Sequence, residues 1–335
     1  MAEIKGVDLI IDTNYILYRS VYSLVNTGTL FGDLEKSLEI TFNNYLHKYP
    51  FHKIYMVSDS KSSWRKRIYA EYKADRKEKR DKNEDVDWDF VFNTYDKFKR
   101  DLNNNRIQAI EGDNIEGDDW INYLINRSNS RGYSTLYVAS DKDLNQKLEF
   151  RLNPAWINIQ WYDNYKNGKI YLPKGYKIFM NEISEYDNND IFALNENADF
   201  LSLVKDLQDK NAIEEVDKEQ SLFVKIISGD SGDNIESVLK TPVKTNPSKF
   251  MGIGDAGAIK IWDKFKSDFP NEIDFKDDTW LDDVVYYVLE YKKVLDDKKT
   301  YQPIVETNLK LNRKLIHLHE NYLPDDIKNK INSLK

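Results

Sequence analysis

Three short apolar runs in the first half of the chain each end in aspartate. They are VDLIID (residues 7–12), KIYMVSD (53–59) and TLYVASDKD (135–143). Short runs rich in Val, Ile and Tyr are typical of strands that are covered on both faces. The sequence therefore predicts three buried strands, whose carboxyl ends carry Asp12, Asp59, Asp141 and Asp143.

Segments with a helical spacing of apolar residues lie between these runs. They cover residues 15–24, 34–49, 87–102 and 117–128. Alternating strands and helices predict an α/β fold with a mostly parallel central sheet flanked by helices. In such sheets ligands bind beyond the carboxyl ends of the strands, where the four aspartates are expected. A hairpin or an edge strand is expected at 168–182.

The second half of the chain has a different pattern. Residues 184–221 contain many Asp, Asn, Glu and Lys residues and are interpreted as an acidic insertion or linker. The sequence from residue 222 onward is mostly helical in pattern, for example in WLDDVVYYVLEYKKVL (280–295). We therefore predict a first domain over residues 1–183 and a smaller helical domain over residues 184–335.

The composition is that of a globular protein that can bury a sizeable core. Hydrophobic residues make up 40% of the 335 positions. Because there is no cysteine, disulfides and thiolate metal sites are excluded. We find neither a secretory signal nor an apolar stretch long enough to span a bilayer, so we expect a cytoplasmic protein without a membrane partner.

The charge distribution is more informative than the net charge of −8. Residues 61–82 contain ten basic and four acidic residues, with Trp64, Tyr69 and Tyr72 between them. A charge run usually forms a solvated helix face. Aromatic residues among lysines favour a nucleic-acid contact instead, because bases stack on aromatic rings while cations follow phosphates. Trp88 and Phe92 share a helical face and are interpreted as core residues.

Nine acidic residues follow apolar runs or precede helices. They are Asp12, Asp59, Glu116, Asp118, Asp119, Asp141, Asp143, Asp230 and Asp233. If they converge, their mutual repulsion requires bound cations or protonation of several of them. Oxygen ligands favour Mg²⁺ or Mn²⁺ over zinc, and carboxylate-held metal pairs are common in phosphodiester hydrolysis. The alternative for Asp118 or Asp230 is a simple helix cap.

Six motifs occur in an order that resembles the flap endonuclease / 5′-3′ exonuclease family, especially its phage-encoded ribonuclease H members. They are IDTN, SDSKSSWRKRIYAEYKADR, EGDD, ASDKD, SGDSGDN and GIGDAGA, between about residues 7 and 262. The resemblance implies a nuclease core of the PIN-like type in the first domain. It also implies a basic clamp at about residues 60–105, and a duplex-binding helix-three-turn-helix in the second domain.

The resemblance also implies roles for individual residues. The nine acidic residues match the family's ligands for divalent metals, here Mg²⁺ or Mn²⁺, two at a time. Lys73 and Arg76 match residues that contact the scissile phosphate, and Tyr72 and Arg19 match an aromatic and an arginine of the same site. The basic start of the clamp corresponds to Arg65 and Lys66.

The motif MGIGDAGA (251–258) matches the helix-three-turn-helix. Its glycines, Gly252, Gly254 and Gly257, are expected to allow duplex phosphates to approach the backbone, and relatives often bind K⁺ at this turn. The family usually has Lys or Arg followed by Thr where this chain has Asp255 and Ala256. This difference predicts a weaker grip on the duplex, which the lysines between residues 240 and 249 could offset. Taken alone, the motif favours an ordinary Gly-rich turn before a helix.

The resemblance implies a structure-specific 5′ nuclease that uses two metals on 5′ ends or flaps of DNA and RNA–DNA duplexes. The implied biological role is removal of RNA primers during phage-type DNA replication in the host cytoplasm. The protein is expected to be a monomer, with a replication single-strand-binding protein as a partner. Two alternatives stay open, namely a PIN-like ribonuclease of single-stranded RNA and a non-catalytic binder of branched DNA.

Overall fold

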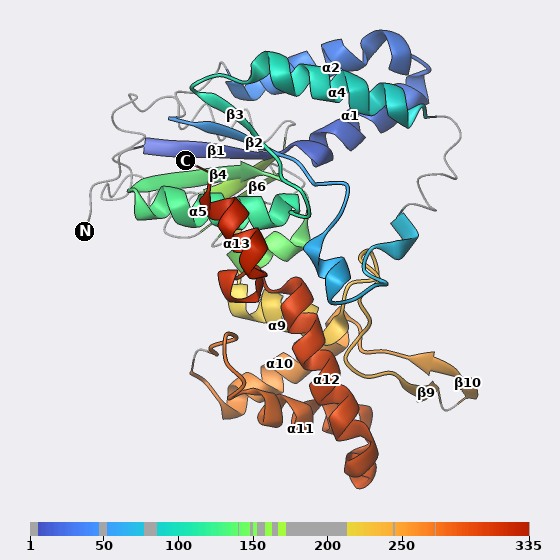
Figure 1. Ribbon diagram of the computed structural model, residues 1–335. Helices are drawn as coiled ribbons and strands as arrows, with labels where there is room; N and C mark the ends of the chain where they lie inside the picture. The colour runs from blue at the N-terminus through green and yellow to red at the C-terminus, as the bar shows by residue number, and fades with distance from the viewer. Residues whose placement is uncertain are drawn as a thin grey trace. The chain divides into compact units, whose positions relative to one another are not determined.

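The computed structural model forms two compact units (Figure 1). The residues that it describes are 6–46, 52–76, 86–139, 141–147, 150–152, 158–162, 167–171, 213–243, 245–271 and 273–334. The first unit consists of residues 1–63, 83–216 and 329–335, and the second of residues 64–82 and 217–328. The domain boundary predicted after residue 183 differs from these units, because the second unit begins at residue 217, includes residues 64–82 and excludes residues 329–335.

The first unit is built on a four-stranded parallel sheet. Its strands are β1 (Gly6–Asp12), β2 (Ile54–Val57), β3 (Ile107–Ile110) and β4 (Tyr133–Val138), in the order β3-β2-β1-β4. Leu9, Ile10 and Ile11 of β1 are fully buried. A central strand that is covered on both faces is expected to be continuously apolar. The mostly parallel sheet and its three predicted strands are confirmed, and β3 is an additional strand.

Four helices flank this sheet. They are α1 (Thr13–Thr27), α2 (Leu30–Leu46), α4 (Trp88–Leu102) and α5 (Gly117–Ser130). Figure 1 shows α1, α2 and α4 on one side of the sheet and α5 on the other. Trp88 stacks on Phe92 and makes edge contacts with Tyr18 and Tyr22. Trp88 and Phe92 are half-buried, so they pack in an aromatic cluster and not in the fully buried core that was predicted.

A second, antiparallel sheet follows β4 in the same unit. Its strands are β5 (Phe150–Leu152), β6 (Asn158–Tyr162), β7 (Asn167–Tyr171) and β8 (Ile213–Glu215), in the order β7-β6-β5-β8. The hairpin expected at 168–182 overlaps β7, and its residues 172–182 lie outside the described residues. Residues 184–212 of the expected acidic insertion also lie outside them.

The second unit is helical, as the sequence predicts, with one added hairpin. Its helices α9 (Lys218–Ser228), α10 (Asp255–Asp268), α11 (Leu281–Lys292) and α12 (Lys298–Ile316) are followed by α13 (Asp325–Asn332). The hairpin consists of β9 (Thr241–Val243) and β10 (Asn246–Met251).

One hydrophobic core holds the second unit together. It includes Phe223, Val284 and Leu309, which are fully buried, and it also includes Tyr72 of the basic segment. The short 3₁₀ helix η1 (Trp64–Arg67) begins this segment. Through Tyr72, the segment 64–76 packs into this core. The other buried residues of the core lie between Leu222 and Ile316, more than a hundred positions later.

A hydrophobic bilayer core requires about 20 consecutive apolar residues in helical form. Within the described ranges, no helix is long and apolar enough to cross a membrane.

Candidate active site

The carboxyl edge of the parallel sheet carries acidic residues from all four strands. Asp12 ends β1, Asp59 follows β2, Glu116 follows β3, and Asp141 follows β4. Asp12 lies in register with Val57, the last residue of β2. Because the strands are parallel and adjacent, these four residues follow the same edge of the sheet. The sequence predicts this place for the three aspartates but not for Glu116, because β3 was not predicted.

Asp12 and Asp59 are both bound to backbone amides at this edge. Asp12 is the N-cap of α1, and its carboxylate accepts a hydrogen bond of 3.2 Å from the Tyr15 amide. Asp59 accepts a hydrogen bond of 2.7 Å from the amide of Gly117, the first residue of α5. The end of β2 is therefore tied to the start of α5.

The EGDD motif forms the start of α5. Glu116 is the N-cap, and it forms a capping box with Asp119, whose carboxylate accepts a 3.2 Å hydrogen bond from the Glu116 amide. Glu116 and Asp119 are buried, whereas Asp118 is half-buried. The cap that was considered for Asp118 is thus provided by Glu116, and both aspartates lie in the first turn, where the helix dipole favours negative charge.

Asp141 and Asp143 lie beyond β4, next to the short 3₁₀ helix η2 (Lys142–Lys147). The Asp141 carboxylate accepts a 2.8 Å hydrogen bond from the Asp143 amide, and both residues are half-buried. Gln146 donates a 2.8 Å hydrogen bond to the Asp143 carbonyl. These bonds fix the DKD motif as a compact turn at the end of the strand.

A chain of buried hydroxyl groups lies beneath the aspartates of β1 and β2. Thr13 donates to the Val57 carbonyl over 2.6 Å and lies 2.9 Å from the Ser58 hydroxyl, which lies 3.3 Å from the Tyr95 hydroxyl. Burial raises the pKa of Tyr95 well above its usual range, so the phenol stays protonated. These residues were not predicted from the sequence, although Thr13 and Ser58 are direct neighbours of Asp12 and Asp59.

The donors of the first unit have the chemistry that Mg²⁺ or Mn²⁺ requires, because all of them are carboxylate oxygens. Within the described part of the chain, no three acidic or histidine side chains are grouped closely enough to hold a metal ion. Asp12, Asp59 and Asp141 instead accept hydrogen bonds from backbone amides. Convergence of the acidic residues on metals therefore stays a prediction. Arg19 is exposed on α1.

Asp233 in the second unit is surrounded by three residues of the basic segment. It is 7% exposed. Its carboxylate accepts a 2.9 Å hydrogen bond from the Tyr72 hydroxyl, forms an ion pair with Arg76, and lies 3.7 Å from the Lys73 ammonium. The Lys73 amide donates to the Asp233 carbonyl over 2.9 Å. The residues predicted to contact phosphate are thus held together by one of the residues predicted to bind metal.

Asp230 begins the tight turn that presents Asp233. Its amide and carbonyl form hydrogen bonds of 2.9 and 2.8 Å with Ile235, and its carboxylate pairs with the Lys225 ammonium at 2.5 Å. Burial alone would raise the pKa of Asp230, but Lys225 and the amides of Gly232 and Asp233 outweigh it and lower this pKa.

Arg65 and Lys66, the predicted start of the clamp, have different environments. Arg65 is buried, lies 4.5 Å from the Trp64 ring centroid, and donates from Nε to the Leu315 carbonyl over 2.8 Å. Lys66 is exposed. Arg65 therefore attaches the basic segment to the end of α12, whereas Lys66 is available to solvent. Residues 77–85, in the middle of the predicted clamp, lie outside the described residues.

The GIGDAGA motif forms the turn before α10 and the first turn of this helix, and two of its glycines are closely packed. A Cβ atom on Gly252 would lie 2.8 Å from the Ser237 Cβ, and one on Gly257 would lie 2.6 Å from the Tyr291 hydroxyl. A Cβ atom on Gly254, the N-cap of α10, would meet no other atom within 4 Å. The open amides at this helix start are a geometry that suits anions.

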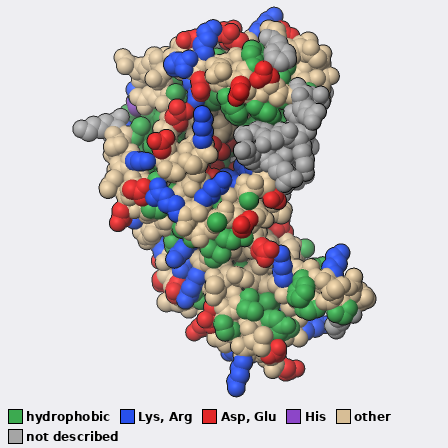
Figure 2. Space-filling view, turned by 45° about the vertical axis from the view of Figure 1, so that its right-hand side comes forward, with side chains coloured by type: hydrophobic (Ala, Val, Ile, Leu, Met, Phe, Trp, Pro, Cys, Tyr) green, Lys and Arg blue, Asp and Glu red, His purple; other side chains and the backbone are tan. Residues whose placement is uncertain are grey.

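The surface next to this turn is both apolar and basic. Phe250 and Met251 of β10 are 59% and 60% exposed, and Lys240 and Lys249 are exposed nearby in the sequence. Figure 2 shows hydrophobic side chains gathered on the second unit, with lysine and arginine side chains around them.

Comparison with solved structures finds the same fold in a phage protein. The D15 protein of bacteriophage T5, co-crystallised with metal ions, is 15% identical, with 97% of this chain and 96% of that chain covered and a TM-score of 0.51. A structure described as T5 5′-exonuclease with bound divalent zinc ions is 14% identical at the same coverage, with a TM-score of 0.50. At these identities the likeness concerns the fold.

Comparison with curated proteins finds no match. The sequence model of a family described as "5′-3′ exonuclease, N-terminal resolvase-like domain" matches residues 8–175. This range contains the parallel sheet, its four flanking helices and the acidic residues at its carboxyl edge. It also contains four of the six motifs that suggested the family, from IDTN to ASDKD. The chain belongs to the 5′-3′ exonuclease family.

Proposed function

We propose that the protein is a metal-dependent 5′ nuclease that hydrolyses phosphodiester bonds at 5′ ends or flaps of DNA and RNA–DNA duplexes. The observation that carries this proposal is the acidic edge of the parallel sheet within the residues that match the exonuclease family. Acidic residues follow all four strands there, and oxygen donors suit the divalent cations that phosphodiester hydrolysis commonly uses.

In this proposal the carboxylates of the first unit hold two Mg²⁺ or Mn²⁺ ions. These residues are Asp12, Asp59, Glu116, Asp118, Asp119, Asp141 and Asp143. Bound divalent cations would make water more acidic and stabilise negative charge on phosphate oxygens. The hydroxyl chain from Thr13 to Tyr95 fixes the ends of β1 and β2, so Asp12 and Asp59 keep a constant spacing.

Lys73 and Arg76 are proposed to bind the phosphate that is cleaved and to stabilise the charge that develops on it. The support is their arrangement around Asp233 and Tyr72, because a buried carboxylate that pairs with both cations fixes where they lie. Asp233 is then a positioning residue for two cations, and its proposed contact with metals would be a second role. Asp230 supports the turn through Lys225, and Arg19 is proposed to assist at the same phosphate.

The second unit is proposed to bind duplex through backbone contacts at Gly252, Gly254 and Gly257, with Lys66 as a further contact. A K⁺ ion at this turn is part of the proposal. Phosphate contacts release counterions, so duplex affinity should fall steeply with salt. Asp255 in the first turn of α10 opposes such contacts, whereas Lys249 and Lys240 of the neighbouring segment favour them.

The proposed biological role is the removal of RNA primers and flaps in phage-type DNA replication in the host cytoplasm. The support is the resemblance to phage-encoded ribonuclease H members of the family and the fold shared with a phage T5 protein. A replication single-strand-binding protein is proposed as a partner, and a monomer as the active form.

The decisive experiment measures Mg²⁺-dependent cleavage of a 5′-labelled flap, a nicked duplex, an RNA–DNA hybrid and a single-stranded RNA. We expect cleavage of the first three and loss of cleavage when the divalent metal is chelated. Cleavage of single-stranded RNA alone would instead identify a PIN-like ribonuclease. Tight flap binding without cleavage at any metal concentration would identify a non-catalytic binder.

Asp141→Ala tests the assignment of the acidic edge. We expect flap binding in the absence of divalent metal to stay nearly unchanged, and cleavage to be abolished. Asp101→Ala is the matched control, because Asp101 is an exposed residue at the end of α4. If Asp141→Ala cleaves as fast as Asp101→Ala, the proposed metal ligands are wrong.

A further inference from the structure

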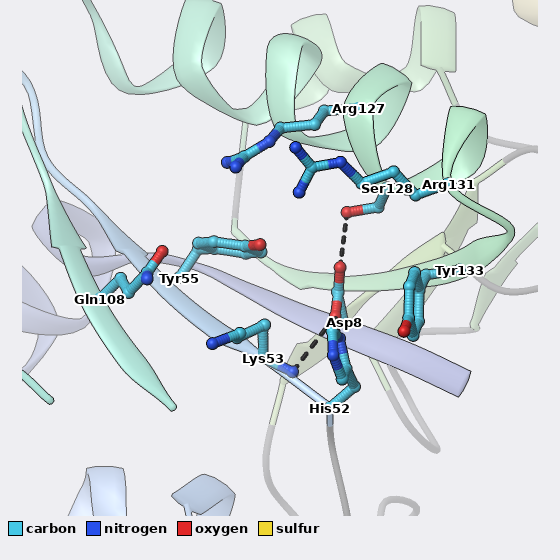
Figure 3. Close-up of a pocket in the computed structure, with 9 residues that line it drawn as sticks. All are labelled: Asp8, His52, Lys53, Tyr55, Gln108, Arg127, Ser128, Arg131 and Tyr133. Carbon is cyan, nitrogen blue, oxygen red and sulfur yellow. Dashed lines mark hydrogen bonds and ion pairs between the residues drawn. The ribbon is translucent and has the colours of Figure 1, made fainter. Parts of the chain in front are cut away.

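A small cavity lies near the amino ends of the strands in the first unit (Figure 3). Its volume is about 230 Å³. It is lined by residues near the starts of β1, β2, β3 and β4 and by the end of α5. Asp8 in this cavity and Asp12 at the acidic edge are four residues apart on β1, or about 13 Å at the rise of a strand. The cavity is thus separate from the acidic edge.

The cavity lining is strongly basic. Lys53, Arg127 and Arg131 contribute three positive charges, and Asp8 contributes the one carboxylate among the lining residues. With His52 neutral, the lining carries a net charge of +2, the difference of +3 and −1. A concave surface of one charge sign concentrates ions of the opposite sign.

Asp8 is already satisfied by other groups. It is 2% exposed. Its carboxylate accepts hydrogen bonds of 2.7 Å from the Ser128 hydroxyl and 3.1 Å from the Lys53 amide, and it lies 2.9 Å from the His52 Nδ1. Asp8 therefore organises one wall of the cavity and does not form an ion pair with either arginine.

The two guanidinium groups face the cavity without a partner among the described residues. Figure 3 shows Arg127 and Arg131 extending from the end of α5 so that their guanidinium groups lie near each other and near the Tyr55 ring. Neither side chain forms a hydrogen bond or ion pair with another described residue, and the Arg127 Nη1 atom is buried.

A simpler role for these arginines is to stabilise the negative end of the α5 dipole. That role does not account for the buried Nη1 atom of Arg127, because a buried donor without an acceptor is costly. Two like charges that converge on one cavity are also unfavourable unless an anion lies between them.

The other lining residues offer hydrogen-bond donors and an aromatic surface, which suit a ligand larger than a simple halide ion. Burial and the nearby Asp8 raise the pKa of Tyr55, so its hydroxyl remains a donor. Gln108 adds an amide, and the rings of His52 and Tyr133 stack at 4.1 Å with an angle of 12° to form a flat aromatic wall. The volume is below that of typical pockets for drug-sized ligands, which limits the ligand to a small one.

We propose that this cavity binds a phosphate monoester, held by Arg127 and Arg131, with a sugar-sized group against the His52–Tyr133 wall. Arginine pairs bind the oxygens of a phosphate dianion through several charge-assisted hydrogen bonds. The monoester can be a free sugar phosphate or the 5′-terminal phosphate of an oligonucleotide. This inference is independent of the proposed nuclease activity.

Isothermal titration calorimetry on the full-length protein, with divalent metals chelated, tests the proposal. The probes are ribose 5-phosphate, ribose, and a dinucleotide with and without a 5′-phosphate. We expect binding of at least one phosphorylated probe and of neither unphosphorylated one. Binding of ribose 5-phosphate alone assigns the site to a small metabolite, and binding of the phosphorylated dinucleotide alone assigns it to a nucleic-acid end.

Variants locate the binding site. Arg131→Gln and Arg127→Gln should each weaken binding by roughly tenfold or more, because each removes charge-assisted hydrogen bonds. Arg100→Gln is the control, since Arg100 is exposed in the last turn of α4 and does not line the cavity. Arg131 is itself exposed, so its replacement leaves the fold intact even if that of the partly buried Arg127 does not. Absence of binding to both phosphorylated probes, or equal affinity in Arg131→Gln and Arg100→Gln, would overturn the proposal.

Discussion

Replacing Gly229 by alanine should severely disturb the turn that carries Asp230 and Asp233. Gly229 follows α9 with φ 73° and ψ −166°, a backbone conformation that is essentially restricted to glycine. A Cβ atom on Gly229 would lie 2.4 Å from the Ile235 carbonyl oxygen and 2.6 Å from the Glu236 carbonyl carbon. Both obstacles are backbone atoms, so a side-chain rotation cannot relieve them.

The magnitude follows from two contributions. The backbone conformation costs an alanine about 1–3 kcal/mol. Moving the Ile235 backbone also strains its two hydrogen bonds with Asp230, of 2.9 and 2.8 Å, each of which contributes about 0.5–1.5 kcal/mol. We expect the free energy of unfolding of the second unit to fall by about 2–6 kcal/mol, a large part of the 5–15 kcal/mol typical of a domain.

Urea unfolding followed by tryptophan fluorescence measures this loss, because Trp262 and Trp280 lie in the core of the second unit. Gly232→Ala is the matched control in the same turn. Its φ is not positive, and its added Cβ would meet the Asp230 carboxylate oxygen at 3.1 Å, which can move. We expect a loss below about 1 kcal/mol for the control. Equal losses in the two variants would refute the reasoning from backbone geometry.

Three further changes test other parts of the structure. Asp233→Asn keeps an acceptor for Tyr72 but removes the charge that faces Lys73 and Arg76. Urea unfolding should therefore show a free energy of unfolding that is lower by about 1–3 kcal/mol. An unchanged midpoint would contradict the ion-pair assignment. The lowered pKa of Asp230 stabilises the folded state above the unfolded pKa of about 3.9, and this contribution is lost as the pH falls through the folded pKa. Unfolding between pH 5 and pH 3 should therefore be less pH-dependent in Asp230→Asn than in the unchanged protein, and equal slopes would argue against it. Thr13→Val removes a buried 2.6 Å hydrogen bond to the Val57 carbonyl. We expect thermal or urea unfolding to show a free energy of unfolding that is lower by about 1–3 kcal/mol. Thr27→Val, at the exposed end of α1, is the control and should leave the stability close to unchanged.

The parallel sheet could be predicted because β1, β2 and β4 are apolar runs that need burial on both faces. The strand β3 was missed for the opposite reason. Its sequence is IQAI, with only four residues and a glutamine in second position, and it follows NNNR, which is typical of a turn. Its place at the edge of the sheet allows Gln108 to line a cavity, so the polar residue is compatible with the strand.

The hairpin of β9 and β10 also could not be predicted from hydrophobic periodicity. Its sequence contains Pro242 and Pro247, and proline is normally restricted to strand edges or bulges. All residues of β10 are exposed, so there is no alternation of apolar and polar positions to detect. Its register also shifts between Asn246 and Phe250.

The site residues were found where they adjoin a strong local pattern, and the missed ones depend on distant parts of the chain. Asp12 and Asp59 follow apolar runs directly, whereas Tyr95 contributes to their surroundings from the middle of a helix. The bond between Tyr72 and Asp233 joins residues separated by 161 positions. The basic cavity combines Asp8, His52, Arg127 and Arg131 from separate elements, and no local motif marks such a combination.

The path of the chain between the two units has a consequence for biosynthesis. The chain passes from one unit to the other four times, after residues 63, 82, 216 and 328. Residues 64–82 therefore leave the ribosome long before the helices that bury Tyr72, and before Asp233, which pairs with Arg76. The first unit likewise waits for residues 329–335, where Leu334 accepts a hydrogen bond from Tyr123. Folding of both units is thus expected to finish only after Leu334 has left the ribosome, and chains that stop before Asp233 lack the cation cluster around it.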